Sequence, residues 1–376
     1  MAIRDVESFA FSNNFQDYIT YGRFLQWFAF SEGGKVSVGT VAGQILSDPA
    51  LLLTGYFGFG VSTWVAAQRR VVPGGSLQAG GMCIRLMVPF GTFYQIKWVD
   101  LQNNLVQATL SFNGCDGSIA VYQGDSVGYN GIPGFNMQGG PVIFSTAPQQ
   151  FPLGKIFHAE VQIVIGSGNA GAIALRLFGE NLIFNLSGIN TQYSNRSVYD
   201  ATSIFFGTAS SLLYQTCQVP AQHLIWYDLP GVVNTNWLGD NRVFGGVAVA
   251  NGDQTSFTPV GAQTNWQNVA NNPINPADYN LANANGAVDL YKISAPQNAT
   301  QVAGVMISAV AQKAGGGAQT ASLLLKSNGT VGSGPAVPLT DSFTTQSNVW
   351  PVDPSTGSPF TPAALQALQA GLEVGA

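Results

Sequence analysis

The stretch AEVQIVIGSGNAGAIALRLFG, residues 159–179, decides the fold class. Apolar and polar residues alternate on both sides of a glycine-rich turn, and this period of two is typical of β-strands. Residues 166–171 also satisfy the Gly-x-Gly-x-x-Gly pattern of dinucleotide sites, but that site requires a helix after the glycines. A second strand-like run follows instead. We therefore predict a β-hairpin and no bound cofactor.

Similar short runs recur along most of the chain and are bounded by Gly, Asn, Pro or Ser, which predicts an all-β protein without crossover helices. The length of 376 residues favours two domains. We place one β-rich domain at residues 1–229 and a smaller β-rich module at 230–376. Residues 251–287 are rich in Asn and Pro and predict a long ordered loop.

One short helix is predicted near the C-terminus, at residues 362–370. Thr361 is a favourable N-cap, Pro362 suits the first helical position, and Gly371 suits a helix stop. The remaining residues, LEVGA, predict a last short strand.

Charged residues make up only 9% of the chain, with 14 basic and 19 acidic side chains. No basic stripe is present that could bind a phosphate backbone, so we expect no nucleic-acid partner. A neutral surface gives little electrostatic repulsion between copies, which favours a component of an assembly and a homo-oligomer, as a trimer or ring. The N-terminal residues lack the pattern of a signal peptide, so synthesis in a cytoplasm is expected. Residues 50–67 are uncharged, but their glycines and threonines favour buried strands over membrane insertion.

The residue types that carry chemistry are sparse. His158 and His223 are the only histidines, and neither has another His or Cys at metal-ligand spacing, so we expect no metal site. No nucleophile motif accompanies them and the five glutamates are scattered, so we expect no catalytic residues and no enzyme. We interpret His158 and Glu160 as structural, on one face of a strand, with hydrogen bonding and solvation as their roles. Cys83, Cys115 and Cys217 are expected to be buried free thiols.

Aromatic side chains can stack on sugar rings, and those outside the apolar alternation are the candidates for glycan contact. These are Trp237, Trp266 and Tyr279.

Two segments resemble bacteriophage virion proteins that contain a concanavalin A-like, laminin-G-like sandwich, and the resemblance implies such a jelly-roll sandwich for residues 1–229. Residues 151–192 resemble the second half of that sandwich: Phe157, His158 and Glu160 on one strand, then GAIALRLFGE, then a Ser-Gly-x-x-Thr end. Residues 226–243, WYDLPGVVNTNWLGDNRV, resemble the segment that follows, and residues 257–280, 286–294 and 352–374 resemble the C-terminal module. The resemblance covers about the last two thirds of the chain, and residues 1–100 only by strand pattern.

The resemblance implies a structural component of a tailed-phage virion, such as a tail fibre, a tail-tip or baseplate component or a capsid appendage, with other virion proteins as partners. The chain would be assembled in the host cytoplasm. A receptor-binding protein for a host surface glycan is the alternative, followed by a polysaccharide depolymerase. Residues 223–243 are expected to be the last strand of one sandwich, a turn, and the first strand of the next module.

Overall fold

The computed structural model describes residues 3–7, 27–32, 34–39, 50–56, 64–70, 75–126, 140–208, 216–230, 236–261, 264–271, 274–315 and 319–375. These residues form two compact units, with the division between Val243 and Phe244. The sequence predicted a boundary after residue 229. In the structure the first unit extends to Val243, because residues 236–243 are hydrogen-bonded to one of its sheets.

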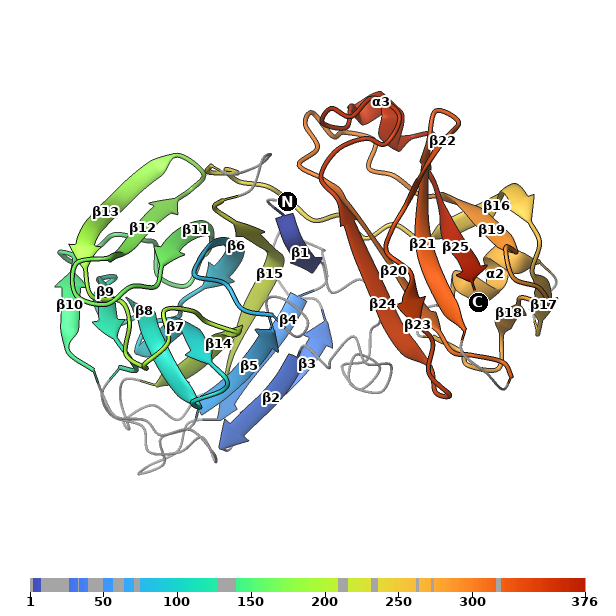
Figure 1. The fold of residues 1–376 in the computed structure, drawn as a ribbon. Helices are drawn as coiled ribbons and strands as arrows, with labels where there is room; N and C mark the ends of the chain where they lie inside the picture. The colour runs from blue at the N-terminus through green and yellow to red at the C-terminus, as the bar shows by residue number, and fades with distance from the viewer. Residues whose placement is uncertain are drawn as a thin grey trace. The chain divides into compact units, whose positions relative to one another are not determined.

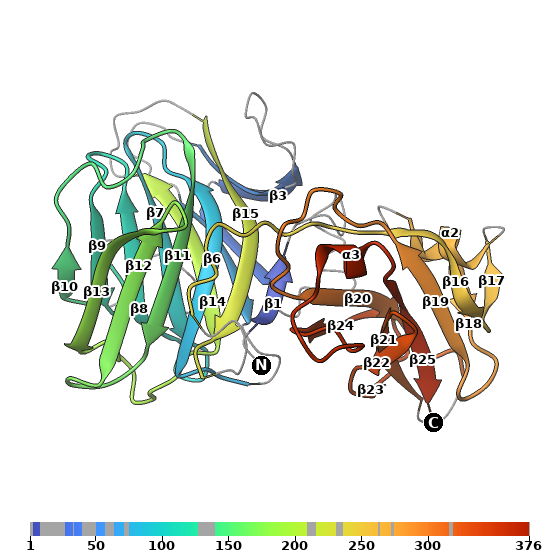
Figure 2. The ribbon, with the colours of Figure 1, turned by 90° about the horizontal axis from the view of Figure 1, so that it is seen from above.

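The first unit is a sandwich of two antiparallel sheets, which confirms the predicted fold class (Figures 1 and 2). The eight-stranded sheet has the order β13-β12-β11-β6-β15-β4-β3, and β1 pairs with β15. Its strands are β1 (Ile3–Glu7), β3 (Gly34–Gly39), β4 (Ala50–Tyr56), β6 (Ala79–Met87), β11 (Ile156–Val164), β12 (Gly171–Leu177), β13 (Asn181–Ile189) and β15 (Thr216–Asp228).

The seven-stranded sheet has the order β10-β9-β8-β7-β14-β5-β2. Its strands are β2 (Trp27–Glu32), β5 (Trp64–Arg70), β7 (Thr92–Asp100), β8 (Leu105–Asn113), β9 (Ile119–Gln123), β10 (Val142–Ser145) and β14 (Ala201–Thr208). The uncharged stretch 50–67 contributes β4 and the start of β5. None of the helices in the described part of the chain is long and apolar enough to cross a membrane.

The core of the sandwich follows from strand alternation. On β11, Phe157 points inward, and its ring centroid lies 5.9 Å from that of Phe112 on β8 in the facing sheet. Trp226 of β15 is 1% exposed, and its Nε1 donates to Thr202 Oγ1 across the sandwich at 2.8 Å. The intervening residues of β6, β11 and β15 must then point to the outer face of the eight-stranded sheet.

The predicted hairpin at residues 159–179 is confirmed. Strands β11 and β12 pair antiparallel, with Ala159 opposite Leu177 and Val164 opposite Ala172. In the turn between them Gly168 has φ +57°, a conformation that favours glycine. The Gly-x-Gly-x-x-Gly pattern therefore belongs to a hairpin turn.

The second unit is built around a six-stranded sheet of order β16-β19-β25-β21-β22, with β23 paired to β21, and two two-stranded ribbons, β17-β18 and β20-β24. Its elements are β16 (Ala248–Thr255), β17 (Thr258–Val260), α2 (Asn265–Val269), β18 (Tyr279–Leu281), β19 (Val288–Ile293), β20 (Val305–Ala311), β21 (Thr320–Ser327), β22 (Thr330–Ser333), β23 (Val337–Pro338), β24 (Thr344–Trp350), α3 (Pro362–Leu365) and β25 (Gln369–Gly375).

The C-terminal helix is shorter than predicted. Thr361 caps it as expected, since its Oγ1 accepts from Ala364 N at 3.1 Å, but α3 ends at Leu365 rather than at residue 370. The chain then enters β25, which lies between β19 and β21. Gly371, which was expected to stop the helix, lies in this strand, where a Cβ would be 1.8 Å from the carbonyl oxygen of Asp289. Close strand packing, not a helix end, therefore explains this glycine.

Residues 251–287 are not the single long loop that was predicted, because they contain β17, α2 and β18. Buried Asp289 of β19 accepts from Asn265 Nδ2 at 2.5 Å, Tyr291 OH at 2.9 Å and the Phe257 amide at 2.8 Å. The side-chain amides of Asn268 and Asn280 also donate to backbone carbonyls here. Polar side chains therefore order this region, and polar contacts of this kind produce no apolar alternation in the sequence.

Candidate functional site

Residues 236–243, NWLGDNRV, lie across the outer face of the eight-stranded sheet, and we call them the strap. Glu160 of β11 accepts two strap amides: Leu238 N at 2.6 Å on Oε1 and Gly239 N at 2.9 Å on Oε2. Gly239 has φ +77°, which allows consecutive amides to turn toward one carboxylate. Glu160 therefore anchors the middle of the strap.

Two further contacts fix the strap. Arg85 of β6 forms a bidentate pair with Asp240, with Nε to Oδ1 at 3.1 Å and Nη2 to Oδ2 at 2.5 Å. The Val243 amide donates to His223 Nδ1 at 3.1 Å. The segment is irregular rather than the first strand of the next module, because side chains of the sheet bind its amides in place of a strand partner.

His223 is positioned by a β-bulge. The pairing of β15 with β6 shifts by one residue between Gln222 and Ile225, and His223 adopts φ +51°. A positive φ is uncommon for a residue with a side chain, and bulges often redirect a side chain next to a functional site. Here the bulge directs His223 toward the strap.

Beneath the strap lies a group of buried side chains that we call the covered cluster: Cys83, His158, Glu160 and Tyr227. Cys83, Glu160 and Tyr227 are 0% exposed and His158 is 3% exposed. Glu160 lies opposite Cys83 in the strand register, and Tyr227 OH donates to Glu160 Oε1 at 2.7 Å. His158 and Glu160 do share a face, as predicted, but the strap covers that face, so the expected solvation is wrong.

Burial controls ionisation in the covered cluster. Burial raises the pKa of the Cys83 thiol well above 9.0, and the charge of Glu160 adds to this. Burial lowers the pKa of His158 from 6.5 to about 4, while Asp240 opposes the shift and Arg85 adds to it. Burial also raises the pKa of Glu160 above 4.5, against the hydrogen bonds from Leu238 and Tyr227. A protonated thiol and a neutral imidazole therefore face Glu160 near neutral pH.

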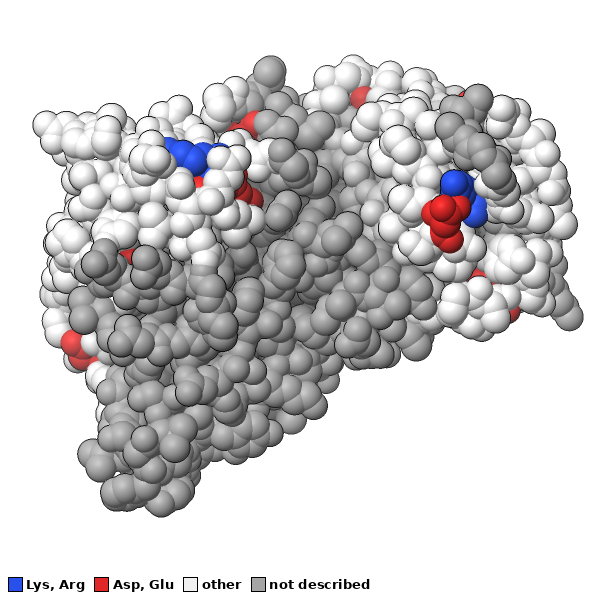
Figure 3. All heavy atoms as spheres, turned by 60° about the horizontal axis from the view of Figure 1, so that its bottom comes forward, with Lys and Arg blue, Asp and Glu red and all other residues white. Residues whose placement is uncertain are grey.

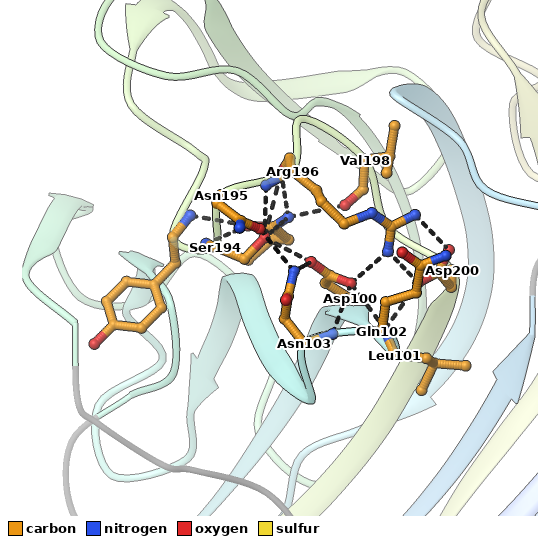
Figure 4. A network of polar contacts seen from close by, with 11 residues as sticks. Asp100, Leu101, Gln102, Asn103, Ser194, Asn195, Arg196, Val198 and Asp200 are labelled. Atoms are coloured by element: carbon orange, nitrogen blue, oxygen red, sulfur yellow. Dashed lines mark hydrogen bonds and ion pairs between the residues drawn. The ribbon is translucent and has the colours of Figure 1, made fainter.

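The first unit contains a second polar network, centred on Asp100 at the end of β7 (Figure 4). Asp100 is 0% exposed and accepts from Ser194 Oγ at 2.6 Å, Asn103 Nδ2 at 2.7 Å and Arg196 Nη1 at 2.5 Å. Arg196 also pairs with Asp200 at 2.9 Å. Both oxygens of Asp100 have partners, so this network ties the 194–200 segment to the sheet rather than offering groups to a ligand.

The three predicted glycan-contact residues are divided between the two units, with Trp237 in the first and Trp266 and Tyr279 in the second. Trp237 lies on the strap and is half-buried, with the Arg176 guanidinium 4.6 Å from its ring centroid. Trp266 is half-buried on α2, and Tyr279 on β18 is 39% exposed. Asn268 of α2 donates to the Tyr279 carbonyl at 2.8 Å, so Trp266 and Tyr279 share one substructure of the second unit.

Sequence reasoning missed Cys83, Arg85 and Tyr227 as neighbours of His158 and Glu160. No spacing in the sequence reveals them, because they lie on β6 and β15, the two strands that follow β11 in the sheet, and the pairing of these strands cannot be read from the sequence. The available signal was the charge of the strap, with Asp240 and Arg242 close together in a chain that avoids charge. The expectation of buried thiols holds for Cys83 and is wrong for Cys115, which is exposed; the side chain of Cys217 lies outside the described residues.

No family model and no curated protein matches the chain. Among solved structures, the marine PL-14 alginate lyase from Aplysia kurodai has a TM-score of 0.42 and 12% identity, covering 61% of this chain and 100% of that one. The endo-β-1,4-glucuronan lyase from the fungus Trichoderma reesei has a TM-score of 0.40 and 9% identity, covering 56% and 94%. The lectin UEA-II, complexed with galactose, has a TM-score of 0.30 and 10% identity, covering 54% and 92%.

These comparisons correct one expectation. The sequence led us to expect a protein without enzymatic activity, whereas the similar solved structures include lyases that act on alginate and glucuronan. Scattered carboxylates in a sequence do not by themselves exclude an enzyme, because residues distant in sequence meet across neighbouring strands, as Cys83 and Glu160 do. At these identities the likeness concerns the fold and assigns no activity to this chain.

Proposed function

We propose that the chain is a structural component of a tailed-bacteriophage virion that provides assembly contacts and surface display. One observation carries the proposal: both sheets of the first unit end in uncharged strands on the same side of the sandwich. Strands β10 and β13 are these ends, and the rings of Phe144 and Phe184 on them lie 5.2 Å apart.

Strand edges attract other strands, and proteins that remain monomeric protect them with charges or proline. Neither VIFS of β10 nor NLIFNLSGI of β13 contains such a residue. Val142 on β10 is 55% exposed and Leu182 on β13 is 49% exposed. An edge of this kind supports contact with a second copy of the chain, in a trimer or ring.

The neutral surface supports the same function. Few charged side chains lie on the described part of the face in Figure 3. The whole chain of 376 residues has only 14 basic and 19 acidic side chains. Shape and hydrogen bonding, rather than charge, would then determine how neighbouring copies fit.

The two sequence segments that resemble phage proteins also contact each other. Glu160 of the His-x-Glu strand binds the amides of Leu238 and Gly239 in the Leu-Gly-Asp-x-Arg-Val segment. The two motifs therefore belong to one folded substructure, which supports the view that both resemblances come from a single module.

Mass spectrometry of purified particles tests the virion role, with stoichiometric presence of the chain as the expected result.

Light scattering of the isolated chain tests the proposed contact between copies at the edge strands. We expect an oligomer whose association Leu182→Lys weakens by at least about tenfold, since a charge on an edge opposes strand pairing. Val269→Lys is the matched control, because Val269 is 47% exposed but lies on α2. Absence from particles, or a monomeric wild-type chain at high concentration, would contradict the proposal.

A glycan-binding role is the second candidate, and the exposure of Tyr279 favours it. Tyr279 is 39% exposed next to a turn in which Asn275 Nδ2 donates to Asp278 Oδ2 at 2.7 Å, so an aromatic ring and polar side chains lie close together. A glycan array should show binding that Tyr279→Ala or Trp266→Ala abolishes and Trp237→Ala leaves intact. An array without signal would remove this candidate.

A further inference from the structure

The covered cluster combines three different metal-ligating groups at one point. One atom each from Cys83, His158 and Glu160 lies within 4.8 Å of the other two. The strand register produces this arrangement: Glu160 is opposite Cys83, and His158 is two residues from Glu160 on the same face. The three side chains thus converge without any characteristic spacing in the sequence.

An independent observation points to a missing ligand. Neither Nδ1 nor Nε2 of His158 has a hydrogen-bond partner among the described residues, although the side chain is only 3% exposed. A buried imidazole normally donates from one nitrogen and accepts at the other, and leaving both without partners is unfavourable. A bound ion would provide a partner for one of these nitrogens.

We propose that Cys83, His158 and Glu160 bind one zinc-type divalent transition-metal ion beneath the strap. Zinc favours a thiolate, an imidazole and a carboxylate together, whereas calcium and magnesium favour oxygen ligands alone. A thiolate and a carboxylate balance the two positive charges of the ion, so the centre is neutral, as a buried site requires.

The surroundings of Glu160 suit a ligating carboxylate. Tyr227 OH and the amides of Leu238 and Gly239 donate to its two oxygens and fix their orientation, as supporting hydrogen bonds do at metal sites. The Cys83 sulfur and the Glu160 carboxylate are neighbours, because the two residues lie opposite each other in the strand register. When the metal binds, the S–H bond of Cys83 breaks, an S–metal bond forms, and the thiol proton leaves to solvent.

The site has three protein ligands, which leaves a fourth position of a tetrahedral zinc ion for water or an external ligand. Because Glu160 also binds the strap amides, the metal and the strap share one carboxylate. Metal binding is therefore expected to stabilise the end of the first unit, whether or not the chain belongs to a virion.

The test uses the full-length wild-type chain, purified under reducing conditions and freed of metal with a chelator. Zinc titration should show about one ion bound per chain with release of about one proton, and cobalt should give a thiolate-to-metal absorption band. The melting temperature of the chain should rise when zinc is restored. Failure of the wild-type chain to bind zinc or cobalt would overturn the proposal without reference to any variant.

Variants then identify the ligands. Cys83→Ser and His158→Gln should each weaken zinc binding by at least about tenfold, and Cys83→Ser should abolish the cobalt–thiolate band. Cys115→Ser and Cys217→Ser are the matched controls and should retain both. A band that survives Cys83→Ser, or a crystal structure grown with zinc in which an ordered water alone contacts His158, would contradict the site.

Discussion

Replacing Asp100 with asparagine should destabilise the first unit without changing the size of the side chain. Asp100 accepts from the amides of Gln102 and Asn103, and from the side chains of Asn103, Ser194 and Arg196. Asparagine retains one accepting oxygen and places an NH₂ group against donors on the other side. The substitution also removes the charge that Arg196 faces.

The magnitude follows from these contacts. A hydrogen bond to a charged group contributes about 1.5–3 kcal/mol, and breaking a buried ion pair costs about 3–5 kcal/mol. The Arg196 side chain is 22% exposed and keeps Asp200 at 2.9 Å, which reduces the loss. We therefore expect the free energy of unfolding to fall by about 3 kcal/mol, which for a unit of this size lowers its Tm by roughly 6–12 °C.

Urea unfolding followed by tryptophan fluorescence measures this loss, since Trp98 and Trp226 are buried in the first unit. Asp116→Asn is the matched control: Asp116 is exposed and binds its neighbour Ser118 N at 2.8 Å, so its loss should stay below about 1 kcal/mol. A loss for Asp100→Asn as small as that of the control would refute the reasoning.

The pH dependence provides a second measure of the same contact. Burial raises the pKa of Asp100, but hydrogen bonds from Ser194, Asn103 and Arg196 outweigh it and hold the pKa below 3.8. A carboxyl group whose pKa is lower in the folded state than in the unfolded chain stabilises the protein fully at pH values above its unfolded-state pKa. This stabilisation disappears as the pH falls through the folded-state pKa. The difference in the free energy of unfolding between wild type and Asp100→Asn should therefore be constant above pH 3.8 and shrink below it. A difference that does not shrink in acid would contradict this assignment.

Two further predictions concern packing. Gly81→Ala places a Cβ 2.1 Å from the Tyr227 ring, so Tyr227 must move. The free energy of unfolding of the first unit should fall by about 1–3 kcal/mol, which thermal melting detects as a lower Tm. Gly315→Ala is the control and should be neutral, because the space around Gly315 is open. An unchanged melting temperature for Gly81→Ala would show that the ring has room. Truncation after Phe360 removes β25 from between β19 and β21, so the second unit should become insoluble; a soluble product that melts at the full-length temperature would contradict that expectation.

Strand alternation predicted the architecture because it depends on the local period of two, which is visible at residues 159–179. The helix at 362–370 was extended too far, because Leu368 and Ala370 fit a helical pattern but are buried by neighbouring strands. Local propensity gave no sign of that tertiary packing. The covered cluster could not be predicted at all, since its members meet through the pairing of β6, β11 and β15, and pairing depends on contacts between segments far apart in the chain.

The pairing of β1 with β15 governs when the first unit can fold. Ile3 lies opposite Tyr227, so a strand from the start of the unit completes its sheet only against one of the last strands to be synthesised. Such long-range pairing slows folding, and the strap must then close over the finished sheet. The growing chain therefore exposes an incomplete, aggregation-prone sandwich until residue 243 has left the ribosome, and slower synthesis would prolong this interval.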